Sequence, residues 1–338
     1  MGTKTVTVAG LVGSIVLYFS LVFSTEFELS SLFYLIEFPM LGLFMGLFQM
    51  ALSAHVSDRE VADMADGMSL LYVGGNLGYT VGPILGGLLV TISGYGSLFA
   101  LGFAMTIASL IIIQKGIREN PKFAVREHHG FKDAGRNQRF KPGVFLLIVL
   151  IFLSWFAIAY QAIPLSTFEA RYLDISSPEI GVLLGTNGAL ITIFQSYISR
   201  RIRIERNRKL YSVAIGSLLM AAGYIAVSLS RTFVSLEVAI TITTFGEILI
   251  AVPTQVVLTM FSGRHNRGRY QGYYFASSRA GSSVSVFAAL IIFSLLGNYY
   301  VRGWYIVAFI CIICAVAYTI LSRTIEAEYR TFSDTISK

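Results

Sequence analysis

Three charged side chains fall inside apolar segments of the sequence, namely Glu37, Glu247 and Arg279. Charges at bilayer depth are costly, and they usually pair with one another or belong to a transport pathway. A carboxyl group at such a depth can take up and release a proton, and a guanidinium beside it changes how readily it does so. The chemistry that these residues suggest is proton transfer.

Glu247 and Arg279 belong to consecutive apolar segments and lie at similar depths, ~14–17 Å from the same side at ~1.5 Å per residue. They can therefore meet as a buried pair. In a functional interpretation, Glu247 carries a proton and Arg279 modulates it. In a structural interpretation, the two form a permanent ion pair that holds the second half of the chain together.

Glu37 lies near the outer end of the second apolar segment. At that depth it is either a cavity carboxylate that attracts cationic substrates or an interfacial group beside the outer headgroups.

Four polar residues on other apolar segments are candidates for a substrate cavity. They are Tyr160, Gln161, Asn187 and Gln195. If they face a cavity, these groups hydrogen-bond a substrate, and if they face another helix, they only bridge neighbours.

Metal, redox and enzyme chemistry have weaker support. Cys311 and Cys314, the two cysteines of the chain, have the C-x-x-C spacing of redox or metal sites, but no further Cys or His lies near them. The adjacent pair at 128–129 is two histidines without a positioned third ligand. His55 and Asp58 likewise lack a third partner for a membrane enzyme. The sequence therefore predicts no enzyme, no metal site and no cofactor.

The composition identifies the elements that must position these residues. The chain has 338 residues, of which 55% are hydrophobic and 13% charged, whereas soluble domains carry about 25% charged residues. Its apolar residues form long blocks, and blocks of about 20 such residues cross a bilayer as helices. We predict an all-α polytopic membrane protein with about ten transmembrane helices, near residues 5–23, 32–54, 67–92, 97–114, 143–163, 179–198, 210–229, 233–258, 270–296 and 303–322.

The distribution of basic residues predicts the orientation of the chain. If the N-terminus is cytoplasmic, every Lys and Arg of the 26 falls on the inner side except Arg171, Arg231, Arg302 and the intramembrane Arg279. Both termini are then cytoplasmic, in an integral protein of the plasma membrane. Basic inner loops facing anionic lipid explain the net charge of +7 without a nucleic acid partner.

One long polar segment, 115–142, divides the chain, and its basic composition predicts a cytoplasmic linker. We expect an incomplete N-terminal bundle of four spans at 1–114, a C-terminal six-helix bundle at 143–322 and a cytoplasmic tail at 323–338. A second basic loop at 199–209 has no counterpart in the first half, because the chain begins directly at a span. The first half is therefore expected to lack two helices.

The stretch "NLGYTVGPILGG" places glycines and a proline in the middle of a predicted span. Small residues let helices approach closely, and a proline permits a bend. We interpret this stretch as a packing and bending surface formed by Gly78, Gly82, Pro83, Gly86 and Gly87.

Together these features resemble the major facilitator superfamily of secondary transporters. The glycine-proline stretch is similar to the antiporter motif of that family, with Ser69 in place of an earlier glycine. Residues 160–165, followed by Asn187 and Gln195, more weakly resemble the seventh and eighth helices of multidrug-efflux-like members of the family. A further stretch beginning at Thr244 resembles the tenth and eleventh helices of multidrug-efflux-like members. Its matching residues are Gly246, Glu247, Pro253, Arg267, Gly268, Tyr270 and Gly272.

The resemblance implies twelve helices in two halves and alternating access. It implies proton-coupled efflux of small, amphiphilic molecules, with protons and the lipid bilayer as partners. It also makes Arg267, Gly268, Tyr270 and Gly272 a cytoplasmic latch to helix ends, where cations favour C-terminal carbonyls.

The chain also departs from the family pattern. The basic motif between the second and third family helices is absent, and so is the arginine that begins the fourth-helix motif, which argues against coupling by that arginine. The alternatives are a truncated, non-transporting relative that acts as a sensor or is inactive, a metabolite uptake carrier, and a true start upstream of Met1.

Overall fold

A computed structural model describes residues 3–57, 61–116, 142–161, 177–202, 206–262, 266–296 and 301–336, and the single residues 164, 173 and 175. Over these ranges the regular structure is α-helical. The helices are α1 (Thr3–Glu26), α2 (Ser31–Ser57), α3 (Val61–Gly116), α6 (Pro142–Tyr160), α9 (Ser177–Arg201), α10 (Arg206–Leu229), α11 (Phe233–Met260), α12 (Arg267–Leu296) and α13 (Arg302–Ile336).

The described helices are built for a bilayer. Nine of them contain a stretch long and apolar enough to cross a membrane. Large apolar side chains remain on their surface, including Leu35 at 70%, Ile92 at 70% and Leu295 at 78% exposure. Apolar surface on this scale is unfavourable in water and favourable against lipid tails. The predicted all-α, polytopic membrane fold is therefore confirmed.

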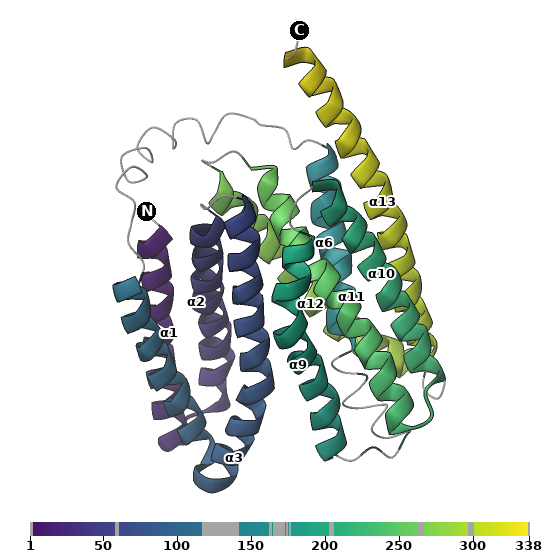
Figure 1. Ribbon diagram of the computed structural model, residues 1–338. Coiled ribbons are helices and arrows are strands. Elements are labelled where there is room, and N and C mark those ends of the chain that lie inside the picture. The colour runs from purple at the N-terminus through teal and green to yellow at the C-terminus, as the bar shows by residue number, and fades with distance from the viewer. Residues whose placement is uncertain are drawn as a thin grey trace. The chain divides into compact units, whose positions relative to one another are not determined.

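Helix α3 contains two of the predicted spans, 67–92 and 97–114. Its two arms meet at Gly94, which has φ 75° and ψ −179°. The Ser97 hydroxyl donates to the carbonyl of Gly94 at 2.7 Å and to that of Leu89 at 3.2 Å, which closes the turn. Figure 1 shows the arms running in opposite directions from this turn. The break lies at Gly94 and not at Pro83, where the sequence had suggested a bend; the helix continues through Pro83.

Replacement of Gly94 by alanine is expected to lower the free energy of unfolding by about 1–3 kcal/mol, because that backbone conformation is accessible essentially to glycine alone. Thermal unfolding of the purified protein in detergent measures the effect. Gly74→Ala in the same helix is the matched control, because an added Cβ there meets no atom within 4 Å. Equal melting temperatures for the two variants would contradict the prediction.

The chain divides into two compact units, and each is described by itself. The first contains Met1–Asp58, Val81–Arg139 and Arg264–Gly268. In it, α1 packs along α2, where a Cβ at Gly10 would lie 2.8 Å from the backbone oxygen of Phe44. The second arm of α3 joins α1, since Lys4 Nζ donates to the carbonyl of Gln114 at 3.2 Å.

The second unit contains Arg59–Thr80, Phe140–Gly263 and Arg269–Lys338. Its core lies where α10 meets α11 and α13, and α6 packs against α13. The largest side chains buried there are aromatic: the Trp304 ring stacks on Tyr224 with centroids 5.5 Å apart and meets Tyr160 edge-on at 5.4 Å. Cys311 and Cys314 are buried in the same core as free thiols.

Small residues form a close seam between α12 and α6. The hydroxyl of Ser277 donates to the carbonyl of Ile148 at 2.6 Å, and that of Ser285 donates to the carbonyl of Phe156 at 2.7 Å. Between them, a Cβ atom at Gly281 would overlap the carbonyl oxygen of Phe152. Residues four apart share a helix face, so one stripe of α12 follows one row of α6 carbonyls.

The structure describes the two ends of the predicted linker. Lys115 and Gly116 end α3 and Pro142 begins α6. Residues 117–141, which include the two histidines at 128–129, lie outside the described residues, as do Asp58 and Arg264. The predicted tail 323–338 continues α13 as a helix to Ile336.

Candidate functional site

The carboxylate of Glu247 lies midway along α11 and is 6% exposed. Two features of the sequence position α11 and the helix beside it. A capping box at Thr232 fixes the start of α11. The neighbouring Gly246 lets α10 approach, because a Cβ at that position would lie 2.7 Å from the backbone oxygen of Gly216. Helix α10 therefore covers one side of α11 beside the carboxylate.

Two uncharged side chains from other helices hold the Glu247 carboxylate. The Tyr72 hydroxyl, from the first arm of α3, donates to Oε1 at 2.5 Å. The Asn187 amide, from α9, donates to Oε2 at 3.1 Å and to the Thr244 hydroxyl at 2.9 Å. Both oxygens thus have a donor, and among the described residues no cation contacts them. Hydrogen-bond donors stabilise a buried carboxylate without neutralising it, so the group can exist in both its protonated and ionised forms.

Aromatic rings line the side of this site. The Tyr72 ring meets Trp155 of α6 edge-on, with centroids 6.4 Å apart, and Trp155 meets Tyr274 of α12 in the same way at 6.5 Å. The Trp155 indole donates to the Tyr274 hydroxyl at 3.2 Å, and that hydroxyl donates to the carbonyl of Ala251 at 3.2 Å. Side chains from α3, α6, α9 and α12 therefore meet at α11 around Glu247.

Arg279 is exposed on α12, whereas Ser278, its neighbour in the sequence, is buried. Among the described residues, the donors to the Glu247 carboxylate are Tyr72 and Asn187, and a pairing with Arg279 stays a prediction.

Glu37 lies in the first unit between α2 and α1, where it is 5% exposed. Its Oε1 accepts hydrogen bonds from Ser24 at 3.0 Å and from Ser20. Its Oε2 is buried and meets no hydrogen-bond partner within the described ranges. In this unit Glu37 therefore bridges α2 and α1.

The other cavity candidates also contact neighbouring helices. Tyr160 is 3% exposed and packs on Trp304. Gln161 accepts a hydrogen bond from Thr243 at 3.3 Å. Gln195 is fully buried, and its amide donates to Ser199 at 2.9 Å and to the carbonyl of Ile248 at 3.3 Å. Of the four candidates, Asn187 alone is brought to Glu247.

The proposed packing motif shows few close contacts in the described residues. A Cβ at Gly78 or at Gly82 would meet no atom within 4 Å, and one at Gly86 would lie 3.0 Å from a methyl group of Leu98. The side chain of Pro83 and the surroundings of Gly87 lie outside the described set. Closer glycine contacts are found at Gly216, Gly246 and Gly281.

The proposed latch residues lie at the start of α12. Arg267 donates to the carbonyl of Ser57, which is the last residue of α2. Carbonyls at a helix C-terminus lack intrahelical partners and favour a cation. A Cβ atom added at Gly268 would meet no atom within 4 Å. The ring centroids of Tyr270 and Tyr273 lie 5.8 Å apart, and Gly272 is partly buried.

Sequence reasoning missed Tyr72, Trp155 and Tyr274. A signal for Tyr72 was present, because Asp66, Ser69 and Tyr72 are spaced by three residues and share one face of α3. That face meets α9: the Ser69 hydroxyl donates to Ser196 at 3.2 Å, and Asp66 pairs with Arg200 at 3.8 Å. A polar stripe on an apolar helix therefore pointed to a partner helix.

Comparison with protein families identifies one match. The sequence profile of the Major Facilitator Superfamily matches residues 1–285 and residues 165–335. A similar curated protein is the uncharacterized MFS-type transporter YttB of Bacillus subtilis (strain 168), which is 21% identical over 258 residues, or 74% of this chain. The match covers 62% of YttB, so the chain spans less than two thirds of the length of that relative.

Solved structures share the fold. The human organic anion transporter MFSD10 (TETRAN) aligns with a TM-score of 0.78 and 17% identity over 94% of this chain and 77% of its own. The fucose:proton symporter FucP of E. coli aligns with a TM-score of 0.70 and 10% identity over 95% of this chain and 83% of its own. At such identities the likeness is one of fold.

Proposed function

Because this chain belongs to the Major Facilitator Superfamily, we propose that it is a secondary active transporter that moves small, amphiphilic molecules out of the cell in exchange for protons. The observation that carries the proposal is the Glu247 carboxylate. It is buried midway along a membrane-spanning helix and held by Tyr72 and Asn187, and no cation of the described residues contacts it. Ionisable groups at such a depth commonly belong to proton or substrate pathways.

The proposed cycle depends on the two hydrogen bonds of Glu247. When the site is open to water, the carboxylate can lose its proton and retain the Tyr72 and Asn187 donors. When the site is closed, the protonated and therefore neutral form costs less in a low-dielectric interior. A conformational change that alternates these exposures moves a proton across the bilayer. In the proposal, the halves at 1–114 and 143–322 alternate around such a site, in the plasma membrane, with both termini cytoplasmic.

A second candidate is transport of anions. Arg279 is exposed on a membrane-spanning helix, and one solved structure of the same fold is that of an organic anion transporter. A cation that faces a water-filled path would attract anionic substrates.

Proteoliposomes that contain the pH dye pyranine test the proposal. Outward gradients of ethidium, of a neutral amphiphile and of benzylsulfonate are applied in turn, and both the lumenal pH and the loss of substrate from the vesicles are followed. A pH change with ethidium or the neutral compound supports proton exchange, and a response to benzylsulfonate alone supports the anion candidate. Flux without a pH change overturns proton coupling, and the absence of any flux supports a non-transporting or sensor role.

A further inference from the structure

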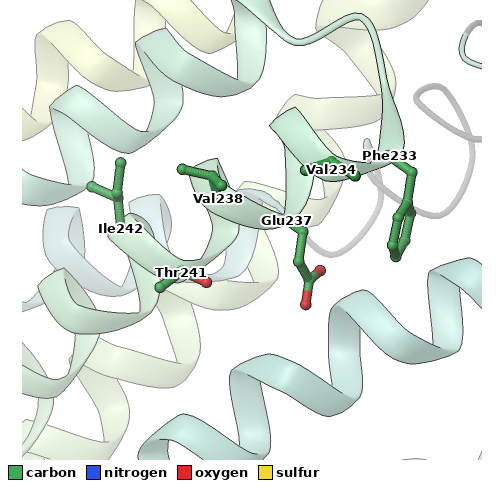
Figure 2. A pocket seen from close by; sticks show the side chains of 6 residues that line it. All are labelled: Phe233, Val234, Glu237, Val238, Thr241 and Ile242. Atoms are coloured by element: carbon green, nitrogen blue, oxygen red, sulfur yellow. The ribbon is translucent and has the colours of Figure 1, made fainter.

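A pocket of about 260 Å³ lies along the first turns of α11, away from the Glu247 site. Most of its lining is apolar, and Glu237 supplies the one charge among the residues that line it. Figure 2 shows the side chains of Glu237 and Phe233 pointing from α11 in the same direction. The lining residues are Phe233, Val234, Glu237, Val238, Thr241 and Ile242.

Glu237 is partly exposed, but one oxygen of its carboxylate is withdrawn from solvent. This oxygen, Oε2, is buried and has no hydrogen-bond partner among the described residues. An acidic side chain near a helix end normally turns its oxygens to the aqueous side, as an interfacial group would. A buried, unpartnered carboxylate oxygen is costly, so this site is built to receive a donor or a positive charge.

Groups nearby in the sequence are already engaged. Thr232 and Ser235 satisfy the helix N-terminus between themselves, with hydrogen bonds of 3.2 and 3.1 Å. The guanidinium of Arg231 donates to the carbonyls of Ser228 and Ser230, at 3.3 and 2.8 Å. Neither the helix end nor this arginine neutralises Glu237.

Polar residues continue from the pocket to Glu247. Thr241 follows Glu237 by four residues, Thr244 follows by three more and Glu247 by a further three, which keeps successive members adjacent on the helix. Asn187 joins Thr244 to Glu247. The two carboxylates are about 15 Å apart along the helix axis.

We propose that the pocket binds organic monocations that carry an apolar group, and that such cations are substrates; this second part rests on the proposed function. The unpartnered carboxylate oxygen receives the ammonium end, and the valines and Ile242 contact the apolar part. The Phe233 ring lies on the same side as the carboxylate and can contribute a cation–π interaction. A metal ion would need more oxygen ligands than one carboxylate and one threonine provide, and an anion would be repelled.

The test is a binding measurement that needs no gradient. Protein in uncharged maltoside micelles is titrated at neutral pH with benzylammonium, whose N–H groups can donate to the carboxylate oxygen, and binding is followed by saturation-transfer NMR. We expect binding by the unmodified chain and about tenfold or greater loss of affinity in Glu237→Gln, since a charged partner contributes at least that factor. Glu237→Asp, which keeps the charge, should retain measurable binding, and benzylsulfonate should not bind.

Two further measurements complete the test. Glu26→Gln, which removes an exposed carboxylate of α1, should bind the cation as the unmodified chain does. The amine of a lipid headgroup has the same chemistry, so the titration is repeated in nanodiscs with phosphatidylethanolamine. Unchanged affinity there supports a soluble cation, and lost binding assigns the pocket to lipid and overturns the substrate proposal. Equal affinities for Glu237→Gln and the unmodified protein overturn the site itself.

The two proposals fail separately. Binding in micelles does not depend on proton coupling, so it should persist in Glu247→Gln. Lost pH coupling with intact cation binding would reject the proton role of Glu247 and leave the pocket standing. If proton coupling is intact but Glu237→Gln binds the cation as the unmodified protein does, the pocket is rejected and the proton role of Glu247 stands.

Discussion

Glu247→Gln is expected to reduce pH-gradient-driven flux to the level of protein-free vesicles and to leave the fold intact. Glutamine has nearly the same shape: its one oxygen can accept from Asn187 and its amide N–H can donate to the Tyr72 hydroxyl, but it cannot lose a proton. The pyranine assay measures the coupled component. Exchange of substrate without a gradient should persist, because it requires no net proton movement.

Glu26→Gln is the charge-matched control and should transport normally, because Glu26 is exposed at the end of α1. Tyr72→Phe tests the same site more gently. It keeps the acid but removes one donor, so coupling should survive with an altered pH profile. Undiminished coupling in Glu247→Gln would remove this residue from the proposed role.

Gly281→Leu is expected to lower the free energy of unfolding by about 3 kcal/mol or more. The reason is geometric: even the first added carbon would overlap the carbonyl oxygen of Phe152, and a backbone atom cannot turn away as a side chain can. The helices α12 and α6 would have to separate, which also breaks the hydrogen bonds of Ser277 and Ser285. Thermal unfolding in detergent measures the loss.

Gly185→Leu on α9 separates this clash from the general effect of a larger side chain. A Cβ at Gly185 meets no atom within 4 Å, and a leucine there can face lipid. The variant should therefore melt close to the unmodified protein. Equal destabilisation by both substitutions would show that the α6–α12 seam does not depend on close approach.

The helices could be predicted because long apolar blocks leave few alternatives in a bilayer, where backbone groups must pair within the segment. That reasoning placed spans on both sides of Gly94. It did not place the turn on Gly94, because a glycine that adopts positive φ looks in a sequence like the packing glycines around it. Family membership was also accessible, since the residues around Glu247 and Arg267 keep the spacing of the family.

The partners of Glu247 could not be predicted, because they come from helices far apart in the chain. Charge suggested Arg279, the nearest cation at similar depth, but distance along a sequence does not reveal which helix faces meet. A tyrosine hydroxyl and an asparagine amide donate to the carboxylate. Glu237 was overlooked for a related reason: a charge one turn inside a span looks interfacial until the burial of its oxygen is known.

The burial of both cysteines has a practical consequence. Cys311 and Cys314 are 2% and 1% exposed in the core beneath Trp304, and buried structural thiols react poorly with alkylating reagents. The natural chain is thus close to a cysteine-free background in its native state. Single cysteines placed at exposed positions, such as those on α9 and α12, can carry spin labels or fluorophores while the native pair stays in place. Distances between such labels would report the motions of this protein directly.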